Sequence, residues 1–411
     1  MKQNQTLKIV LIALFAALVC VATMLVPIPI PASGGYANAG DGVILMCAFL
    51  MGPVNAAFAA GIGSMLADLL LGFILLLIFN PAHAIGGLED MLLSGARDMS
   101  KLGKVLYTAA PLLMTGLSVG FAFKTGLFNI GASGQYTVGA FFALTVGIQF
   151  QLPWYVAILA GMIGGAIWGA IPGIFKAYFN VNEVISAIMF NWIGLFAVNL
   201  ALNNMPMMLA NAWGQVARDR TARLADANPA AALPKLGLDS VFGNYMNIGI
   251  FIAVIFAIIA WVILSKTTFG YELKACGYNR TASLYAGIND KRNIVLSMAI
   301  AGAFAGVGGA IYYLSGTAQF TIIKTLVNMG FNGIPVALLA SSHPIGTIFS
   351  SLFISYIQVG GESLQPEFAK EIIDIIIAAI IYLSAFALLV QGGIARLLSR
   401  KHERAAGKEE D

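Results

Sequence analysis

The sequence contains few charged residues. Only 10% of its 411 residues are Asp, Glu, Lys or Arg and 59% are hydrophobic, whereas a soluble domain carries roughly 25% charged residues. The mean hydropathy is +0.84. This composition excludes a water-soluble enzyme, a nucleic-acid-binding protein and a disordered chain. At ~20 residues per membrane-spanning helix, we predict an all-α, polytopic inner-membrane protein with about 11–12 transmembrane or re-entrant helices.

Reactive side chains are also scarce. The cysteines and histidines are too widely separated to form a metal-ligand spacing or a disulfide framework. They are Cys20, Cys47, Cys276, His83, His343 and His402. The sequence contains no Walker A motif, no dinucleotide-binding glycine motif and no His-Glu-x-x-His. We therefore predict no metal, no cofactor and no catalytic residue; if ATP drives transport, its hydrolysis must take place on a separate polypeptide.

Long apolar stretches recur along the whole chain. The stretches long enough to cross a bilayer are 9–26, 43–60, 62–79, 105–123, 134–150, 154–175, 184–203, 248–265, 294–314 and 371–390. A weaker region, 331–360, is broken at residues 341–344, and its first piece is too short to span. We expect this piece to be a half-span or re-entrant segment, which is tolerated where it is buried in protein.

Charged residues in the loops predict the orientation in the membrane. Lys and Arg outnumber Asp and Glu in the loop 266–293, whereas 80–104 and 205–247 are nearly balanced. Excess Lys and Arg in short loops marks the cytoplasmic side. We expect both termini and 266–293 to be cytoplasmic and 205–247 to be extracytoplasmic. The first apolar run is too long for the core of a signal peptide, so we expect it to be an uncleaved span.

Small residues recur every four positions in two spans. They are Gly161, Gly165 and Gly169 in one span and Gly302, Gly306 and Ala310 in the other. This spacing places them on one helix face and permits close helix–helix contact. Close packing explains the pattern more simply than a moving seam between helices.

Two apolar regions are interrupted by Gly-Asn turns, at residues 126–131 and 330–335. Paired interruptions in corresponding halves of a transporter indicate a binding site near the middle of the membrane. The amides there supply hydrogen-bonding groups and the phenylalanines offer faces for a planar ligand. The alternative is that these turns are only helix caps. Together with polar residues at the start of the span 184–203, the predicted substrate-pathway residues are Phe128, Asn129, Gln135, Asn182, Glu183, Asn191, Phe331 and Asn332.

Two acidic residues at the ends of spans have a simpler interpretation than a role in transport. Glu183 suits the N-terminus of a helix, where the dipole favours a negative charge. Asp374 lies one turn into the last span and could lie at the headgroup level. A proton-coupled carrier would carry several titratable residues deep in its spans. The sequence does not favour such a carrier.

The basic loop 266–293 contains a short amphipathic segment. Residues 280–286 suit one short helix, with Gly287 ending it as a C-cap. A lone helix in a loop is usually only a surface element.

From about residue 74 onward, the chain resembles permease subunits of ABC importers for branched-chain amino acids, ribose and nucleosides, and is most similar to nucleoside permeases. Six blocks carry this resemblance, in family order: 110–117, 124–135, 181–192, 270–279, 285–289 and 330–339. The resemblance implies a helical permease that pairs with itself or with a sister permease. It also implies two cytoplasmic ATPases and an extracytoplasmic solute-binding lipoprotein as partners, and no nucleic acid.

In that family the loop 266–293 is the coupling loop, whose short helix docks onto the ATPase. The resemblance therefore implies a set of ATPase-coupling residues. They are Glu272, Gly277, Asn279, Arg280, Ala286 and Gly287.

The first ~72 residues do not fit the permease pattern. The segments 28–36, 40–43, 50–53 and 61–69 resemble the start of the substrate-binding membrane subunit (S component) of energy-coupling-factor vitamin transporters. We expect residues 1–72 to be membrane helices of that type, joined to a permease domain at 73–411. A fusion whose leading helices only anchor or pack is favoured over a retained vitamin-binding role.

These features predict the permease subunit of an ATP-driven importer, embedded in the bilayer of the plasma or inner membrane. Alternating access would expose a site bordered by 126–135 and 330–335, and the cargo would be a nucleoside or a similar small polar solute. A sugar or branched-chain amino acid permease is the alternative within this class. A vitamin-binding subunit and an ion-coupled carrier are the alternatives outside it.

Overall fold

A computed structural model describes residues 80–365 continuously, together with residues 13–15, 17, 27–30, 35–38, 73–74, 76–78, 367–368, 375 and 378. Residues 93–359 form one compact unit, and residues 1–92 and 360–411 are grouped in the other. Most of the predicted spans 9–26, 62–79 and 371–390, all of 43–60, and Asp374 lie outside the described residues.

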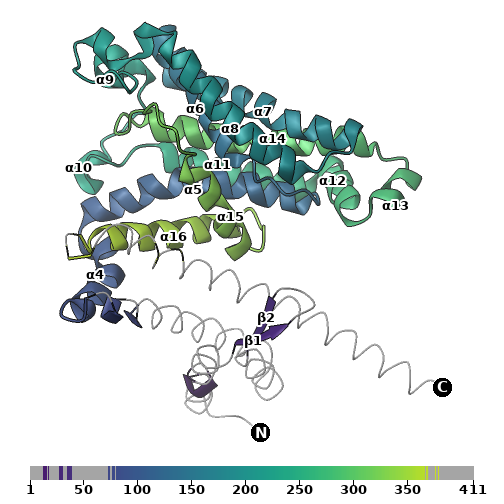
Figure 1. Cartoon of the computed structure of the whole chain (residues 1–411), viewed down its shortest axis with the longest axis horizontal. Helices are drawn as coiled ribbons and strands as arrows, with labels where there is room; N and C mark the ends of the chain where they lie inside the picture. Colours follow the sequence, from purple (N-terminus) through teal and green to yellow (C-terminus); the bar gives the residue numbers. More distant parts are fainter. Residues whose placement is uncertain are drawn as a thin grey trace. The chain divides into compact units, whose positions relative to one another are not determined.

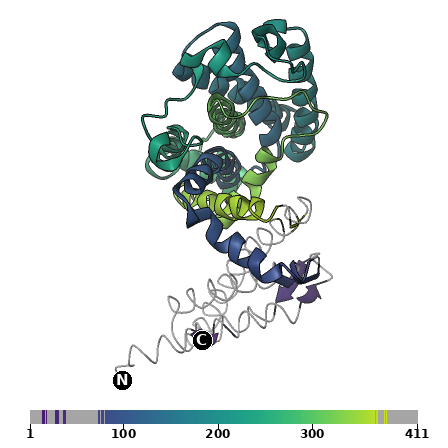
Figure 2. The same cartoon turned by 90° about the vertical axis from the view of Figure 1, so that its left-hand side faces the viewer.

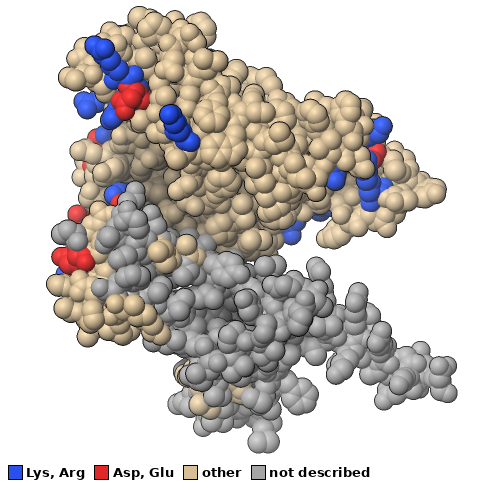
Figure 3. Space-filling view, in the orientation of Figure 1, with Lys and Arg blue, Asp and Glu red and all other residues tan. Residues whose placement is uncertain are grey.

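The chain is mostly helical, as predicted, and five described helices are long and apolar enough to cross a membrane. They are α5 (Met99–Lys124), α7 (Trp154–Phe179), α8 (Glu183–Asn203), α11 (Gly249–Lys266) and α14 (Asp290–Leu314). Each coincides with an apolar stretch of the sequence. They run side by side in Figure 1 and are seen end-on in Figure 2. On the face in Figure 3, charged side chains lie mainly toward the ends of this bundle, as membrane insertion requires.

Shorter helices lie where the sequence is interrupted. The predicted span 134–150 consists of α6 (Ala132–Leu144) and a π-helical turn, η1 (Thr145–Gln149). The broken region 331–360 forms α15 (Asn328–Leu339) and α16 (Gly346–Glu362). Between them Ser341 and Ser342 have positive φ angles of 49° and 54°. The expected break is therefore confirmed, and the 12 residues of α15 make it a half-span.

The centre of the larger unit is α14, which packs against α5, α6 and α7. The two small-residue patterns face each other across α7 and α14. A Cβ at Gly165 or Gly169 would overlap the α14 backbone at Gly302, and one at Gly139 of α6 would overlap Gly306. These helices can approach closely only because these positions carry no side chain.

The polar loops contain the remaining helices. The loop 205–247 holds η2 (Pro206–Met208), η3 (Ala210–Trp213), α9 (Leu224–Ala227), η4 (Pro229–Ala231) and α10 (Asp239–Phe242). The loop 266–293 holds α12 (Thr268–Tyr278) and α13 (Arg280–Tyr285). Figure 1 places α9 and α10 at one end of the bundle and α12 and α13 at the other.

Residues toward the N-terminal end of the described chain form further elements. Helix α4 spans Ala84–Arg97. A small antiparallel hairpin pairs β1 (Pro27–Ile30) with β2 (Gly35–Asn38), with Pro27 opposite Asn38. The sequence analysis did not predict these strands, and they are the exception to the helical fold class.

Candidate functional site

The first interrupted segment joins α5 to α6 through a tight helix end. Gly126 has a φ of +75°, a conformation that favours glycine. The Gly126 amide donates to the Phe123 carbonyl (3.1 Å), and the Leu127 amide donates to the Ala122 carbonyl (3.0 Å). This pattern is a Schellman motif, which satisfies the last carbonyls of a helix. This turn is thus a helix cap, and its contribution to a solute site stays a prediction.

Asn129 and Gln135 bond to each other immediately after this turn. The Asn129 amide donates to Gln135 Oε1 (2.8 Å), and the Gln135 amide donates to Asn129 Oδ1 (2.9 Å). Asn129 also donates to the Ser118 hydroxyl of α5 (2.9 Å). Both amides are buried, so most of their hydrogen-bonding capacity is used within the protein. Their contribution to substrate binding stays a prediction.

Asn191 connects α8 to the same segment. Its Oδ1 accepts from the Gly134 amide (2.8 Å) in the first turn of α6, and its Nδ2 donates to the Ile130 carbonyl (3.0 Å). The side chain is buried, with only 1% of its surface exposed. Leaving either backbone group without a partner would cost about 1–3 kcal/mol. Asn191 therefore fixes the interruption from the neighbouring helix.

The second interrupted segment, in α15, packs directly against the first. A Cβ at Gly330 would overlap the Ser133 backbone, and the Ser133 hydroxyl donates to the Val327 carbonyl (2.9 Å). Pro335 lies inside α15 and has no N–H for the Phe331 carbonyl. The structure thus brings together the two segments that the sequence paired.

The aromatic and amide side chains at these turns differ in accessibility. Phe128 stacks on Phe123 with ring centroids 4.9 Å apart, which covers one of its faces. Phe331 and Asn332 are half-buried. The side chain of Asn332 forms no hydrogen bond within the described part of the chain. Phe331 and Asn332 are thus more available to a solute than Asn129 and Gln135.

Asn182 and Glu183 lie at the start of α8, apart from this group. Asn182 is the N-cap and accepts from the Val184 amide (2.8 Å), while Glu183 pairs with Lys176 of α7 (2.9 Å). These contacts match the simpler interpretation of Glu183 as a helix N-terminal acid. The structure does not join these two residues to the Asn129–Gln135 pair.

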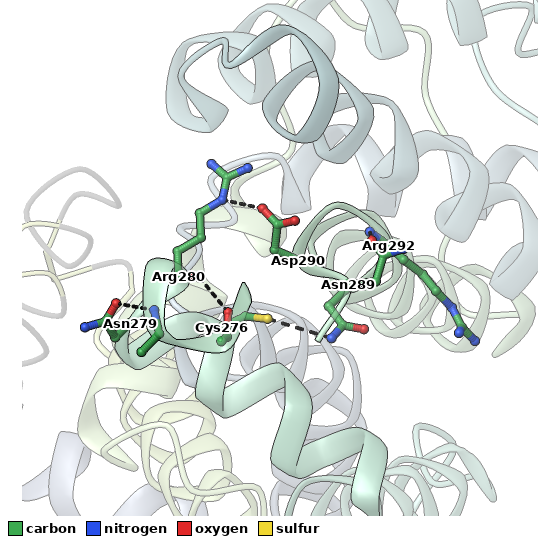
Figure 4. Close-up of polar contacts among 9 residues, drawn as sticks. Cys276, Asn279, Arg280, Asn289, Asp290 and Arg292 are labelled. Carbon is green, nitrogen blue, oxygen red and sulfur yellow. Dashed lines mark hydrogen bonds and ion pairs between the residues drawn. The ribbon is translucent and has the colours of Figure 1, made fainter. Parts of the chain in front are cut away.

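The predicted coupling helix is present as α13. Asn279 caps it by accepting from the Ala282 amide (3.0 Å), Ala286 is its C-cap, and Gly287 follows with a φ of +77°. Arg280 pairs with Asp290, the first residue of α14, at 2.5 Å, as Figure 4 shows. The helix end at Gly287 is therefore as predicted, and the ion pair ties α13 to α14.

The other predicted coupling residues, Glu272 and Gly277, lie on α12. Asn293 of α14 donates to Glu272 (3.3 Å) and to the sulfur of Cys276 (3.7 Å). A Cβ on Gly277 would lie 2.6 Å from the Thr125 carbonyl carbon and 2.7 Å from the Gly126 nitrogen. The end of α12 thus rests on the turn that opens the first interrupted segment.

Sequence reasoning missed several residues that build this region. Ser118 and Ser133 hold the two interruptions, and Gly126 meets Gly277 backbone to backbone. The glycines can be seen in the sequence, but the residues that they contact cannot. Among the described residues, no group of three His, Cys, Asp or Glu side chains could hold a metal ion.

Comparison with known proteins extends these observations. The profile described as branched-chain amino acid transport system / permease component matches residues 102–385. The profile described as ECF-type riboflavin transporter, S component, matches residues 3–89. The N-terminal resemblance is therefore confirmed, and the match extends beyond residue 72. No solved structure shows significant similarity to the chain.

The similar curated proteins are also named as permease proteins of ABC transporters. The nucleoside ABC transporter permease protein NupB of Lactococcus lactis is 36% identical over 350 residues, which cover 82% of this chain and 93% of NupB. The guanosine ABC transporter permease protein NupP of Bacillus subtilis is 36% identical over 72% of this chain and 84% of NupP. The glucose ABC transporter permease protein TsgB13 of Haloferax volcanii is 29% identical over 84% of this chain and 92% of TsgB13.

A permease subunit of an ABC transporter is a multi-pass membrane protein that works with ATPase and binding-protein partners and is not itself an ATPase. The profile match and the NupB identity cover most of this chain. The chain therefore belongs to the family of branched-chain amino acid transport system permease components.

Proposed function

We propose that this permease translocates a nucleoside or a similar small polar solute by alternating access, driven by ATP hydrolysis on its partners. The observation that carries the proposal is the 36% identity to NupB over 93% of that relative's length. NupP, which is named for guanosine, has the same identity over a shorter alignment. The site is bordered by the residues 126–135 and 330–335.

The end of the bundle at α12 and α13 is the docking surface for the ATPase. Large side chains there are exposed to solvent: Tyr271 at 69%, Tyr278 at 88%, Leu284 at 52% and Tyr285 at 90%. Aromatic side chains are enriched where proteins bind each other. The Arg280–Asp290 pair holds α13 against α14, so a push on α13 is passed to a central helix of the bundle.

The contact between Gly277 and Gly126 links this surface to the solute site. The two backbones touch without intervening side chains, so α12 cannot tilt toward α5 without displacing the turn at 125–126. That turn leads within a few residues to Asn129. Movement of the coupling loop therefore reaches the interrupted segment through rigid backbone. Such coupling requires that the packed helices and the turn have two discrete arrangements.

The complete transporter contains further subunits in this proposal. This chain pairs with itself or with a sister permease, and an extracytoplasmic lipoprotein delivers the solute. Both termini and the loop 266–293 face the cytoplasm, and 205–247 faces outward. Residues 1–72 are a leading segment of the S-component type, joined to the permease domain at 73–411.

Purification and uptake test the proposal together. Mild-detergent purification of the chain from native membranes is expected to recover an ATPase and a solute-binding lipoprotein. Proteoliposomes of that complex should accumulate radiolabelled guanosine only when ATP reaches the ATPase side. Radiolabelled leucine and glucose serve as comparison solutes. ATP-dependent accumulation of either but not of guanosine would replace the nucleoside assignment, and recovery of the chain without an ATPase would refute the importer.

A flavin-like solute is the second candidate. Its supporting observation is the match of residues 3–89 to the S component of riboflavin transporters. Those residues are only the start of such a subunit, which disfavours an independent binding role. Adding radiolabelled riboflavin to the same proteoliposomes distinguishes the candidates, since ATP-dependent accumulation of riboflavin but not guanosine would favour the flavin.

A further inference from the structure

A cavity of about 430 Å³ lies at the end of the bundle opposite α12 and α13. Its walls come from the last turn of α14, the connection 318–327 and the first residue of α15. A volume of this size is within the ~300–1,000 Å³ range of small-molecule sites. Val327 lines the cavity, and its carbonyl accepts from the Ser133 hydroxyl. The cavity thus adjoins the junction of the two interrupted segments.

Aromatic rings form one side of this cavity. Tyr312 and Tyr313 meet edge to face with centroids 5.0 Å apart, and Phe320 packs against Tyr313 at 5.3 Å. Tyr107 of α5 stacks behind Tyr312 at 5.6 Å. Tyr313 and Phe320 are buried and support Tyr312, whose half-buried ring offers a face on which a planar ring can pack.

The polar groups lining the cavity are uncharged. The Gln319 amide donates to the Thr221 carbonyl (2.7 Å) and to Gln215 Oε1 (3.1 Å), which fixes the side chain and leaves its own Oε1 free to accept. Asn328 lines the cavity without a side-chain hydrogen bond among the residues described. No Asp, Glu, Lys or Arg lines the cavity. A zwitterionic amino acid would find no counter-charge there, whereas a neutral polar solute needs none.

Two buried polar atoms beside this wall have no hydrogen-bond partner within the described chain. One is the hydroxyl of Tyr136, whose ring packs edge to face against Tyr313 at 6.3 Å. The other is Oδ1 of Asn199, whose amide donates to the carbonyl of Ile323, a cavity residue (2.8 Å). Buried polar atoms are normally satisfied. Both atoms are enclosed behind the cavity wall and neither residue lines the cavity, so neither atom is a contact for the solute.

We propose that this cavity is a binding site for an uncharged, planar heteroaromatic solute bearing hydroxyl groups, which is the chemistry of a nucleoside. The solute ring packs against the aromatic wall, and Gln319 Oε1 and the Asn328 amide bond its polar edge. The solute occupies this site before reaching the interrupted segments. The inference rests on the proposed function, because it takes the nucleoside class from there.

Direct binding tests the cavity. Full-length chain in lipid nanodiscs is titrated with radiolabelled guanosine, with leucine and ribose as comparison ligands. Asn328→Trp fills the mouth of the cavity from an exposed position and should weaken guanosine binding at least tenfold. Gln319→Ala removes the Oε1 acceptor together with the two internal hydrogen bonds that position it, and should weaken binding by at least about three- to tenfold. Asn244→Trp, at an exposed asparagine away from the cavity, should keep wild-type affinity, and size-exclusion profiles verify that each variant is folded.

The outcomes distinguish failure of the cavity proposal from failure of the proposed transport function. Wild-type affinity in folded Asn328→Trp, or no guanosine binding to the wild-type chain, would overturn the cavity site even if the complete transporter takes up guanosine. Leucine binding that Asn328→Trp abolishes would overturn the ligand class. Failure of the complete wild-type transporter to take up any nucleoside would instead refute the proposed function.

Discussion

The contact between Gly277 and the turn at Thr125–Gly126 provides a sharp test of coupling. Gly277→Ala would place a methyl carbon 2.6 Å from the Thr125 carbonyl carbon. Because carbon atoms pack best at ~3.5–4.0 Å, α12 and the turn must separate by about 1 Å. Overpacking of this kind costs about 1–3 kcal/mol, against a helix-propensity gain of up to about 1 kcal/mol. We expect a net loss of about 1–2 kcal/mol of stability.

The functional effect should exceed the effect on stability. Once the turn no longer follows α12, ATP hydrolysis proceeds without moving the interrupted segment. In proteoliposomes of the complete transporter, we expect the amount of guanosine taken up per ATP hydrolysed to fall several-fold in Gly277→Ala. The amount of ATPase that co-purifies should not change.

Gly86→Ala in α4 is the matched control. An added Cβ at Gly86 meets no atom within 4 Å, so this variant receives the helix-propensity gain without the overlap. It should have an equal or slightly higher melting temperature and wild-type coupling. A Gly277→Ala transporter with a wild-type ratio of uptake to hydrolysis would refute coupling through this contact, even if its melting temperature fell.

Four other substitutions test neighbouring contacts. Asn191→Leu leaves two buried backbone groups unpaired and should destabilise the purified chain by about 2–5 kcal/mol, measured by thermal unfolding. Arg280→Glu faces the buried carboxylate of Asp290 and should lower uptake more than ATPase activity, measured in the same proteoliposomes. Asn332→Ala should reduce guanosine uptake with no change in melting temperature, whereas Asn129→Ala should reduce both because its amide is bonded internally.

Two of these predictions have a control at a similar residue. Asn204→Leu, on the exposed end of α8, should leave stability within about 0.5 kcal/mol of the wild type, and an equal loss in both variants would contradict the role of Asn191. Arg292→Glu makes the same charge change at an exposed position next to Asp290. Equal uncoupling by both reversals would indicate net charge rather than the ion pair. Wild-type uptake in both Asn129→Ala and Asn332→Ala would remove the interrupted segments from the solute site.

The sequence was sufficient for features encoded in adjacent residues. Hydrophobic length located α5, α7, α8, α11 and α14, because a span must satisfy its backbone within one helix. The break at 341–344 and the end of α13 at Gly287 were equally local, since polar runs and glycine determine backbone conformation where they occur. The hairpin of β1 and β2 was missed, because two four-residue strands give too short a pattern among apolar runs.

Only the tertiary structure decided which segments meet and what each amide does. A glycine permits close approach to any partner, so the sequence could not pair Gly277 with Gly126, Gly330 with Ser133, or one glycine pattern with the other. An asparagine can bind solute or hold backbone with the same atoms. Packing assigned Asn191 to the backbone and left Asn332 open, because hydrogen bonds depend on neighbours that are distant in sequence.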